Sequence, residues 1–158
     1  MKFIDLFCGM GSFHQSFKKL GWTCVMACDI NEAARKTYAA NHGIEPLGDI
    51  CEIDPTKVPA YDVVCAGFPC QPFSQAGHHR GFEDPRGTMF FQVMKFVQRR
   101  PIAVILENVP ALLTHDSGAT FQRIVSELDT AGYDVHHKLL KCSDLGIPQN
   151  RKRLIILG

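Results

Sequence analysis

The stretch Lys2-Phe-Ile-Asp-Leu-Phe-Cys-Gly-Met-Gly-Ser12 decides the fold of this chain. Its first half is mostly apolar and predicts a buried strand, and its second half predicts a tight turn. Gly9 and Gly11 allow a close approach of the backbone within that turn. Apolar side chains then recur at helical spacing over residues 13–20. A strand, a glycine turn and a helix in this order present backbone N–H groups to a polar or anionic ligand.

The same alternation continues along the whole chain. Strands are expected near residues 2–7, 23–28, 46–50, 61–66, 102–107, 133–141 and 153–158, and helices near residues 12–20, 31–41, 87–99 and 118–131. Strands that alternate with helices predict an α/β fold with a doubly wound, mostly parallel sheet. The last two strands are joined by a short link that contains Gly146 and Pro148, so they should pair antiparallel. At 158 residues the chain is expected to form one domain with its own core.

The second expected strand ends in Asp29, whose carboxylate can bind the two hydroxyl groups of a ribose. A dinucleotide fingerprint would need a third glycine where this chain has His14. That difference argues against NAD and against a dehydrogenase. A glycine turn with Asp29, without the third glycine, instead favours a nucleoside that lacks a pyrophosphate, and S-adenosylmethionine fits.

A cysteine between two prolines provides a candidate nucleophile. Residues 67–74 read Gly-Phe-Pro-Cys-Gln-Pro-Phe-Ser and directly follow an apolar stretch that predicts a buried strand. Because Pro69 and Pro72 stiffen this segment, Cys70 is expected on a rigid turn at a strand end, where α/β sheets bind their ligands. The alternative role is that of a small buried hydrophobic residue. It suits the cysteines that lie inside apolar runs, which are Cys24, Cys28 and Cys65.

The stretch Ile102-Ala-Val-Ile-Leu-Glu-Asn-Val-Pro110 adds a carboxyl group to this set. Its apolar half predicts a strand. Glu107 is therefore expected at the same sheet edge as Cys70 and Asp29. A carboxyl group at such a position either caps a helix or acts as an acid or base.

The composition is that of an ordinary soluble globular protein, with 46% hydrophobic and 21% charged residues. No run approaches the roughly 20 apolar residues of a membrane span, and the N-terminus does not resemble a signal peptide. The seven cysteines form an odd number and contain no Cys-x-x-Cys pair, which disfavours disulfide bonds and a zinc site. These features predict reduced thiols, no bound metal and a cytoplasmic location.

Four motifs occur in the order in which the cytosine-5 DNA methyltransferases carry them. They are Asp5-Leu-Phe-Cys-Gly-Met-Gly11, Gly67-Phe-Pro-Cys-Gln-Pro-Phe-Ser74, Glu107-Asn-Val109 and Gln149-Asn-Arg-Lys-Arg153. The chain resembles this family over essentially its whole length, with Cys8 in place of a more usual alanine. The resemblance implies a seven-stranded S-adenosylmethionine-dependent methyltransferase sheet whose last strand is reversed. It also implies methyl transfer from S-adenosylmethionine to carbon 5 of cytosine in DNA, on a base that leaves the helix stack.

The resemblance further implies a role for each site residue. Cys70 would attack carbon 6 of cytosine, and Glu107 would hydrogen-bond or protonate ring N3. Arg153 would contact the base carbonyl, and Arg151 would help to hold the site. The residues expected to line the cofactor site are Phe7, Gly9, Gly11, Asp29, Ile30, Asp49, Ile50 and Phe68. Simple core packing is an equal alternative for the three apolar residues Ile30, Ile50 and Phe68. The residues expected near the substrate are Pro69, Gln71, Ser74, Asn108 and Val109. Residues 71–87 are expected to form a mobile loop that closes over the flipped base.

The chain ends at Gly158, before the target-recognition domain and the final motif of that family. We therefore expect the catalytic part of a truncated or split enzyme, which would act on double-stranded DNA together with a second subunit, as in restriction-modification. A net charge of only +1 agrees with a partner that supplies most phosphate contacts. Two alternatives stay open. One is an inactive remnant that holds cofactor or a partner. The other is a tRNA cytosine-5 methyltransferase, disfavoured because the short insert of that branch is missing after the Pro-Cys-Gln region.

Overall fold

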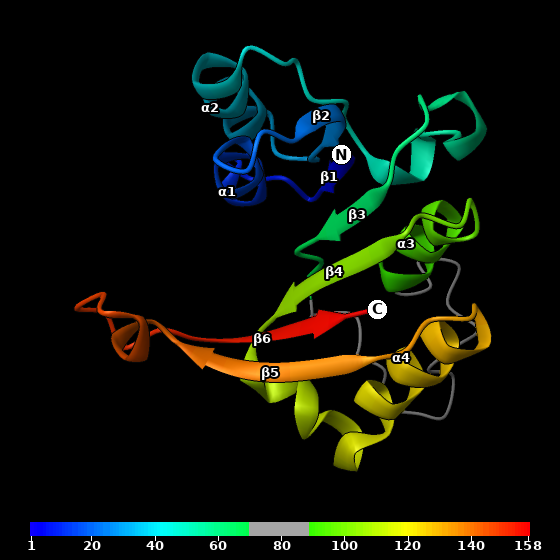
Figure 1. Ribbon diagram of the computed structural model, residues 1–158, viewed down its shortest axis with the longest axis vertical. Coiled ribbons are helices and arrows are strands. Elements are labelled where there is room, and N and C mark those ends of the chain that lie inside the picture. Colours follow the sequence, from blue (N-terminus) through cyan, green and yellow to red (C-terminus); the bar gives the residue numbers. More distant parts are fainter. Residues whose placement is uncertain (70–88) are drawn as a thin grey trace. The chain divides into compact units, whose positions relative to one another are not determined.

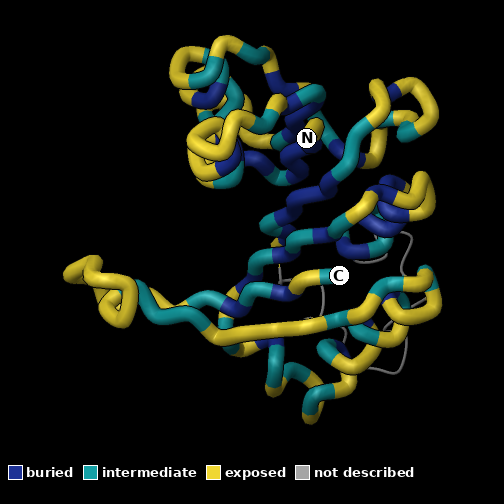
Figure 2. The backbone as a smooth tube through the Cα atoms, viewed as in Figure 1, coloured by how far each residue is buried: buried dark blue, intermediate teal, exposed yellow. Residues whose placement is uncertain are grey.

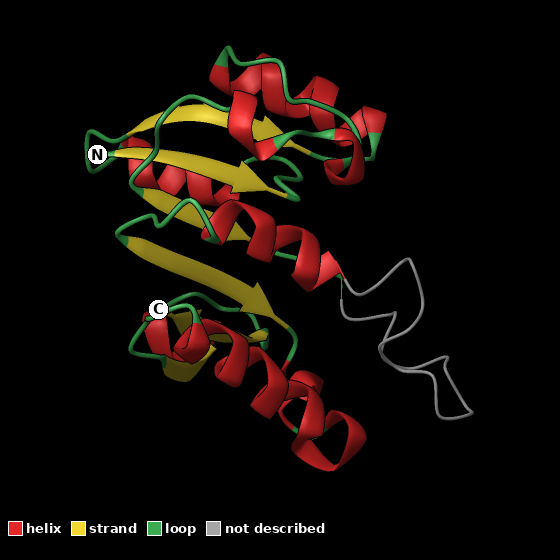
Figure 3. Cartoon of the chain, turned by 90° about the vertical axis from the view of Figure 1, so that its right-hand side faces the viewer, coloured by secondary structure: helices red, strands yellow, loops and turns green. Residues whose placement is uncertain are grey.

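A computed structural model of the chain describes residues 1–69 and 89–158. These residues contain six strands in the sheet order β2-β1-β3-β4-β6-β5. The chain divides into two compact units, Met1–Gly67 with Gln92–Val104 and Phe68–Phe91 with Ile105–Gly158. Strands and helices alternate along the chain, and Figure 3 shows both kinds of element. The loop predicted over residues 71–87 lies outside the described residues.

The first unit is built on three parallel strands. β1 (Lys2–Leu6) lies between β2 (Thr23–Cys28) and β3 (Val63–Ala66). All of β3 and the apolar residues of β1 are completely buried. Parallel strands covered on both faces carry continuous apolar runs, which explains the composition of these segments. Figure 2 shows β3 as part of the buried centre of this unit.

Two helices, α1 (Ser12–Lys18) and α2 (Glu32–His42), lie on the same side of β1 and β2 (Figure 1). α2 begins where the side chain of Asn31 accepts the N–H of Ala34 at 3.1 Å. It ends at Gly43, which has a φ of 70° that glycine adopts without strain. Tyr38 of α2 is completely buried.

Residues 44–59 differ from the expectation. The strand predicted near residues 46–50 is reduced to one bridge, in which Leu47 pairs with the last residue of β2. Pro46 has no N–H to donate and Gly48 weakens a strand, so the pairing does not extend. Two short 3-10 helices follow at Ile50–Glu52 and Pro55–Lys57. The described part of the chain therefore has six strands rather than the seven that the resemblance implied.

Two elements, α3 (Met89–Val97) and β4 (Ala103–Asn108), contain residues of both units. In the second unit, α4 (Ala119–Thr130), β5 (His136–Lys141) and β6 (Lys152–Leu157) follow β4. β6 runs antiparallel to both β4 and β5, so the predicted antiparallel pairing of the last two strands is confirmed. Short 3-10 helices occur at Pro110–Leu113, His115–Gly118 and Cys142–Leu145.

The predicted fold class is confirmed as a mixed α/β sheet with the last strand antiparallel. The strands are not equally buried. β5 is exposed along most of its length (Figure 2). Among the helices that the structure describes, none has the length and apolar character needed to cross a membrane.

Candidate functional site

The turn after β1 holds the first group of predicted site residues. Phe7, Gly9 and Gly11 have φ values of 56°, 53° and 91°. Only a few per cent of non-glycine residues adopt a positive φ, so Phe7 is held in an unusual conformation. The N–H of Gly11 closes the turn on the carbonyl of Cys8 at 2.8 Å. A side chain at Gly9 would meet no atom within 4 Å, so the backbone there borders open space that a ligand can enter.

Asp29 fixes this turn to the end of β2. Its Oδ2 accepts the N–H of Gly9 at 2.8 Å, and its Oδ1 accepts the N–H of Asn31 at 2.8 Å. Each carboxylate oxygen has a second acceptor position, so the group can still bind ligand hydroxyls. The neighbouring Ile30 is 74% exposed, which shows that it is not a core residue. The end of β2 thus presents a carboxylate beside an exposed apolar side chain.

Asp49 and Ile50 lie in the segment that meets the end of β2. The N–H of Asp29 donates to the carbonyl of Leu47 at 3.1 Å, which places this segment beside β2. Asp49 caps a 3-10 helix, because its Oδ1 accepts the N–H of Cys51 at 2.9 Å. Ile50 is only 5% exposed, so it packs in the core of the first unit.

In the second unit, Glu107 and Arg153 form an ion pair. Nε of Arg153 lies 2.6 Å from Oε1 of Glu107, and both side chains are about three-quarters buried. Glu107 on β4 stands opposite Ile155 on β6, so Arg153 is its diagonal neighbour on the same face of the sheet. Long side chains reach across such a diagonal. The sequence indicated both residues as site residues but gave no sign that they touch.

Asn108 anchors the backbone just before the predicted nucleophile. It is 4% exposed, its Nδ2 donates to the carbonyl of Phe68 at 3.0 Å, and its Oδ1 accepts the N–H of Val109 at 2.9 Å. Phe68 is buried and its ring packs on Phe90 with centroids 5.8 Å apart. Its predicted contact with a cofactor stays a prediction. The sequence did not reveal this anchor, because the two residues are 40 positions apart.

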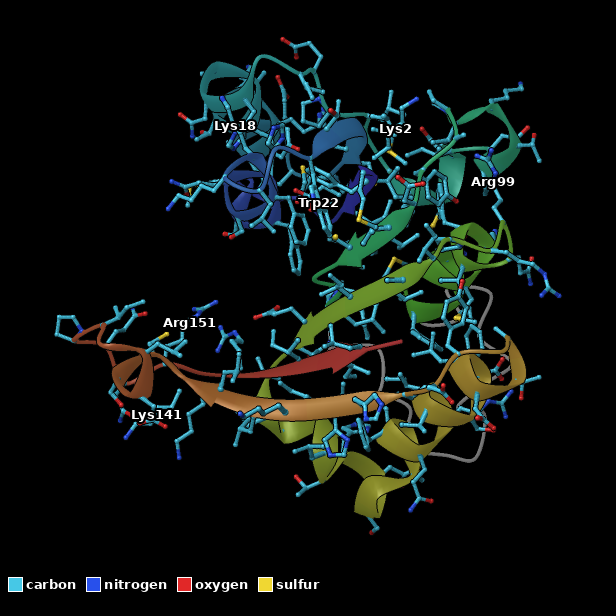
Figure 4. All side chains as sticks on the ribbon, in the orientation of Figure 1. Lys2, Lys18, Trp22, Arg99, Lys141 and Arg151 are labelled. Carbon is cyan, nitrogen blue, oxygen red and sulfur yellow. The ribbon has the colours of Figure 1, made fainter. Side chains whose placement is uncertain are left out.

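The remaining predicted site residues are more exposed. Pro69 and Val109 are exposed, and so is Arg151, which directly precedes β6 (Figure 4). The carbonyl of Arg151 accepts the N–H of Cys142 at 2.9 Å. The side chains predicted at Cys70, Gln71 and Ser74 lie outside the described residues.

Three cysteines predicted as buried hydrophobic residues behave as the sequence predicted. Cys24, Cys28 and Cys65 are at most 6% exposed. Burial raises the pKa of Cys24 to about 11 and that of Cys28 to about 12, and it also raises the pKa of Cys65. These thiols stay protonated near neutral pH and are poor nucleophiles. In residues 1–69 and 89–158, no cluster of three or more His, Cys, Asp or Glu side chains could hold a metal ion.

Comparisons with known proteins show which family the chain resembles. The family model for C-5 cytosine-specific DNA methylases matches residues 1–158. The type II methyltransferase M.MspI of Moraxella sp is 46% identical over 159 residues, which cover 99% of this chain and 38% of the relative. M.NgoBI of Neisseria gonorrhoeae is 48% identical over 158 residues, which cover 99% of this chain and 50% of the relative. The chain thus spans about half the length, or less, of these curated relatives.

Solved structures support the same fold. The Dnmt2 methyltransferase of S. pombe matches with a TM-score of 0.77 at 22% identity, over 99% of this chain and 50% of that chain. A putative DNA modification methyltransferase encoded within a prophage of E. coli matches with a TM-score of 0.79 at 23% identity, over 100% of this chain and 46% of that chain. Because the family model covers every residue and close relatives align with almost the whole chain, this protein belongs to the C-5 cytosine-specific DNA methylase family.

Proposed function

We propose that this chain is the catalytic and cofactor-binding part of a DNA cytosine-5 methyltransferase. It would transfer the methyl group of S-adenosylmethionine to carbon 5 of cytosine in double-stranded DNA, with Cys70 as the nucleophile. The observation that carries the proposal is the Glu107–Arg153 ion pair on a chain of this family. These two side chains would offer one carboxyl and one guanidinium group to the same cytosine ring.

The turn residues and the end of β2 fit an adenosine group. Asp29 keeps acceptor positions for a ribose diol, because each of its oxygens accepts one backbone N–H in the described residues. The exposed Ile30 offers an apolar surface to a flat ring, and the open space at Gly9 lets a ligand reach the backbone. Phe7, Gly11 and Asp49 would complete this binding surface, with Ile50 supporting it from the core. S-adenosylmethionine would supply an electrophilic methyl group on a sulfonium.

Carbon 5 of cytosine is a weak nucleophile, so the ring must first be activated. Addition of the Cys70 thiolate to carbon 6 would place electron density on the ring. Glu107 would hydrogen-bond or protonate N3 and so stabilise the charge that develops there. Its Oε1 is bound by Arg153, whereas its Oε2 has no side-chain partner among the described residues and is available to the base.

Arg153 is also prepared for a second contact. Its Nε binds Glu107, and its Nη1 donates to the carbonyl of Lys152 at 2.7 Å. The guanidinium has five N–H donors in a fixed plane, so its remaining donors can bind the carbonyl oxygen of cytosine. Asn108 would help to position the nucleophile without touching the base, because it binds the carbonyl of Phe68, two residues before Cys70.

The substrate and partners of the whole protein are part of the proposal. M.MspI and M.NgoBI are type II methyltransferases, and this similarity favours DNA over RNA as the substrate of this chain. The target base would have to leave the duplex, because carbon 6 cannot be reached inside the stack. The predicted second subunit with the target-recognition domain stays a prediction.

Covalent trapping tests the proposal. Duplex DNA with 5-fluorocytosine would be incubated with S-adenosylmethionine and the purified chain, without and with the part of M.NgoBI that lies outside the match. We expect an adduct that disappears in Cys70→Ala and is strongly reduced in Glu107→Gln. Adduct formation that persists in Cys70→Ala would refute the assigned nucleophile. Adducts on tRNA and none on DNA would favour the tRNA enzyme, and calorimetric binding of S-adenosylhomocysteine without any adduct would favour a cofactor-binding remnant.

A further inference from the structure

Three aromatic rings from two helices gather beside the glycine turn. His14 comes from α1, and Tyr38 and His42 come from α2. Nδ1 of His14 lies 2.7 Å from the hydroxyl of Tyr38. The imidazoles of His14 and His42 are stacked, with centroids 4.1 Å apart and planes at 14°, and the ring of Tyr38 meets His42 edge-on at 4.7 Å. We call these three side chains the ring cluster.

The ring cluster touches the turn at two neighbouring residues. Nε2 of His42 lies 3.2 Å from the carbonyl oxygen of Met10, and a carbonyl only accepts, so Nε2 must be the donor. The next residue, Gly11, has no room for a side chain. A Cβ atom there would lie 2.6 Å from Cδ2 of His42 and 3.0 Å from Cε2 of Tyr38. The two rings therefore fill the space directly beside Gly11.

The other end of the ring cluster is fixed in the interior. Tyr38 is fully buried, and its hydroxyl lies 3.5 Å from Sγ of Cys24 on β2. His14 is 6% exposed, and its ring also packs edge-on against Phe3 of β1. Burial, with smaller effects of His42 and Lys18, lowers the pKa of His14 to about 4. The imidazole is therefore neutral at physiological pH, and the ring cluster carries no charge at His14 that would favour opening.

The two glycines of the turn explain why contacts that order it matter. Gly9 and Gly11 have greater backbone freedom than other residues, so a turn built on them loses much entropy when it is ordered. Asp29 holds Gly9 from the β2 side at 2.8 Å. His42 holds Met10 and encloses Gly11 from the α2 side. A binding loop that is already ordered loses less entropy when its ligand arrives.

We propose that His42 is a positioning residue that keeps the glycine turn, residues 7–12, in its binding conformation. It acts through its Nε2–H on the carbonyl of Met10 and through its ring beside Gly11. It does not need to touch the cofactor. The effect on S-adenosylmethionine rests on the proposed function, whereas the effect on the order of the turn does not.

Paired substitutions separate the two parts of this contact. His42→Phe keeps a ring for the stack but removes the donor, and His42→Gln keeps a donor near the position of Nε2 but removes the ring. Thr37→Ala is the matched control, because Thr37 is exposed on the same helix and its hydroxyl donates to the carbonyl of Ala33 within α2. The readouts are amide hydrogen exchange at Gly9 and Gly11, the calorimetric affinity for S-adenosylhomocysteine, and the melting temperature.

We expect His42→Phe to speed exchange at Gly11 and to weaken S-adenosylhomocysteine by about fivefold, the usual effect of one lost hydrogen bond. His42→Gln should restore most of both values, and Thr37→Ala should change neither. Turn exchange in His42→Phe that equals exchange in Thr37→Ala would overturn the proposal, even if affinity falls. If neither His42 variant folds, as judged by its melting curve, the assigned role is also wrong, because a positioning residue is not required for folding. Faster exchange in a protein that never binds S-adenosylhomocysteine would uphold the role of His42 and refute the proposed cofactor.

Discussion

Asp5 should make the stability of this protein strongly dependent on pH. It lies in the middle of β1, is 1% exposed, and neither carboxyl oxygen has a well-formed hydrogen bond in the described residues. Burial raises its pKa from 3.8 to about 8, and the charge of Asp29 adds to the rise. The backbone N–H of His14 and the hydroxyl of Tyr38 lie near enough to lower the pKa, but by less than burial raises it.

The folded and unfolded states differ in whether Asp5 carries a proton. Between pH 4 and pH 8 the folded protein keeps a proton on Asp5 that the unfolded chain has released, so stability falls as the pH rises through this window. One pKa unit corresponds to about 1.4 kcal/mol, so the free energy of unfolding should fall by about 3 to 4 kcal/mol between pH 5 and pH 8 through this group. Above pH 8, Asp5 is ionised in both states, so its effect on the free energy of unfolding no longer changes with pH.

The substitution Asp5→Asn removes the titration with almost no change of shape. We would measure urea unfolding of the wild type and the variant at pH 5, 6, 7 and 8. Relative to the wild type, the variant should gain about 3 to 4 kcal/mol of stability between pH 5 and pH 8, whatever the difference between the two proteins at pH 5. Thr37→Ala, at an exposed position that carries no titratable group, is the control and should leave the pH dependence unchanged. Parallel pH profiles for wild type and Asp5→Asn would refute the reasoning.

Four further results are expected. Gly11→Ala should destabilise the first unit by about 2 kcal/mol or more in urea unfolding, because its φ of 91° and the neighbouring rings exclude a side chain. Gly9→Ala is the matched control for this first result and should cost less, because a Cβ atom at Gly9 would meet no atom within 4 Å. Asp29→Ala should weaken S-adenosylhomocysteine by about 1–3 kcal/mol in calorimetry, because it unties the turn and removes the ribose acceptor. Glu107→Gln should lower methyl transfer to DNA at least about 100-fold in a labelled-methyl assay, with little change in cofactor affinity. Asn108→Ala should cost about 1–3 kcal/mol of stability in urea unfolding, because the carbonyl of Phe68 loses its buried donor. A variant with the same urea midpoint as the wild type would contradict this.

The parts of the fold that the sequence predicted are those set by local patterns. The strand, glycine turn and helix at the N-terminus depend on neighbouring residues, and so does the position of Asp29 at the end of β2. The antiparallel direction of β6 follows from a link too short for a crossover. Each of these signals lies within about a dozen residues, where propensity and turn chemistry act directly.

The parts that the sequence did not predict depend on contacts between distant residues. The ion pair of Glu107 with Arg153 requires the register of two strands, and one residue of slip would turn the side chains to opposite faces. The ring cluster likewise needs α1 and α2 in their packed positions, and in the sequence His14 stands out only because it occupies the position of a third glycine. The expected strand near residues 46–50 was wrong for a local reason, because Pro46 and Gly48 outweighed its apolar neighbours.

The first unit contains a buried carboxyl group, that of Asp5, just before the glycine turn. A buried carboxyl without good hydrogen bonds costs free energy, and a core built for stability alone would place an apolar residue at Asp5. Asp5 lies two residues before Phe7, and it shares neighbours with the ring cluster through His14 and Tyr38. Proteins tend to retain such local conflicts at functional sites and to offset them elsewhere in the fold. The conflict at Asp5 and the support from His42 therefore meet at the same segment, the glycine turn, which is the segment that the proposed function assigns to the cofactor.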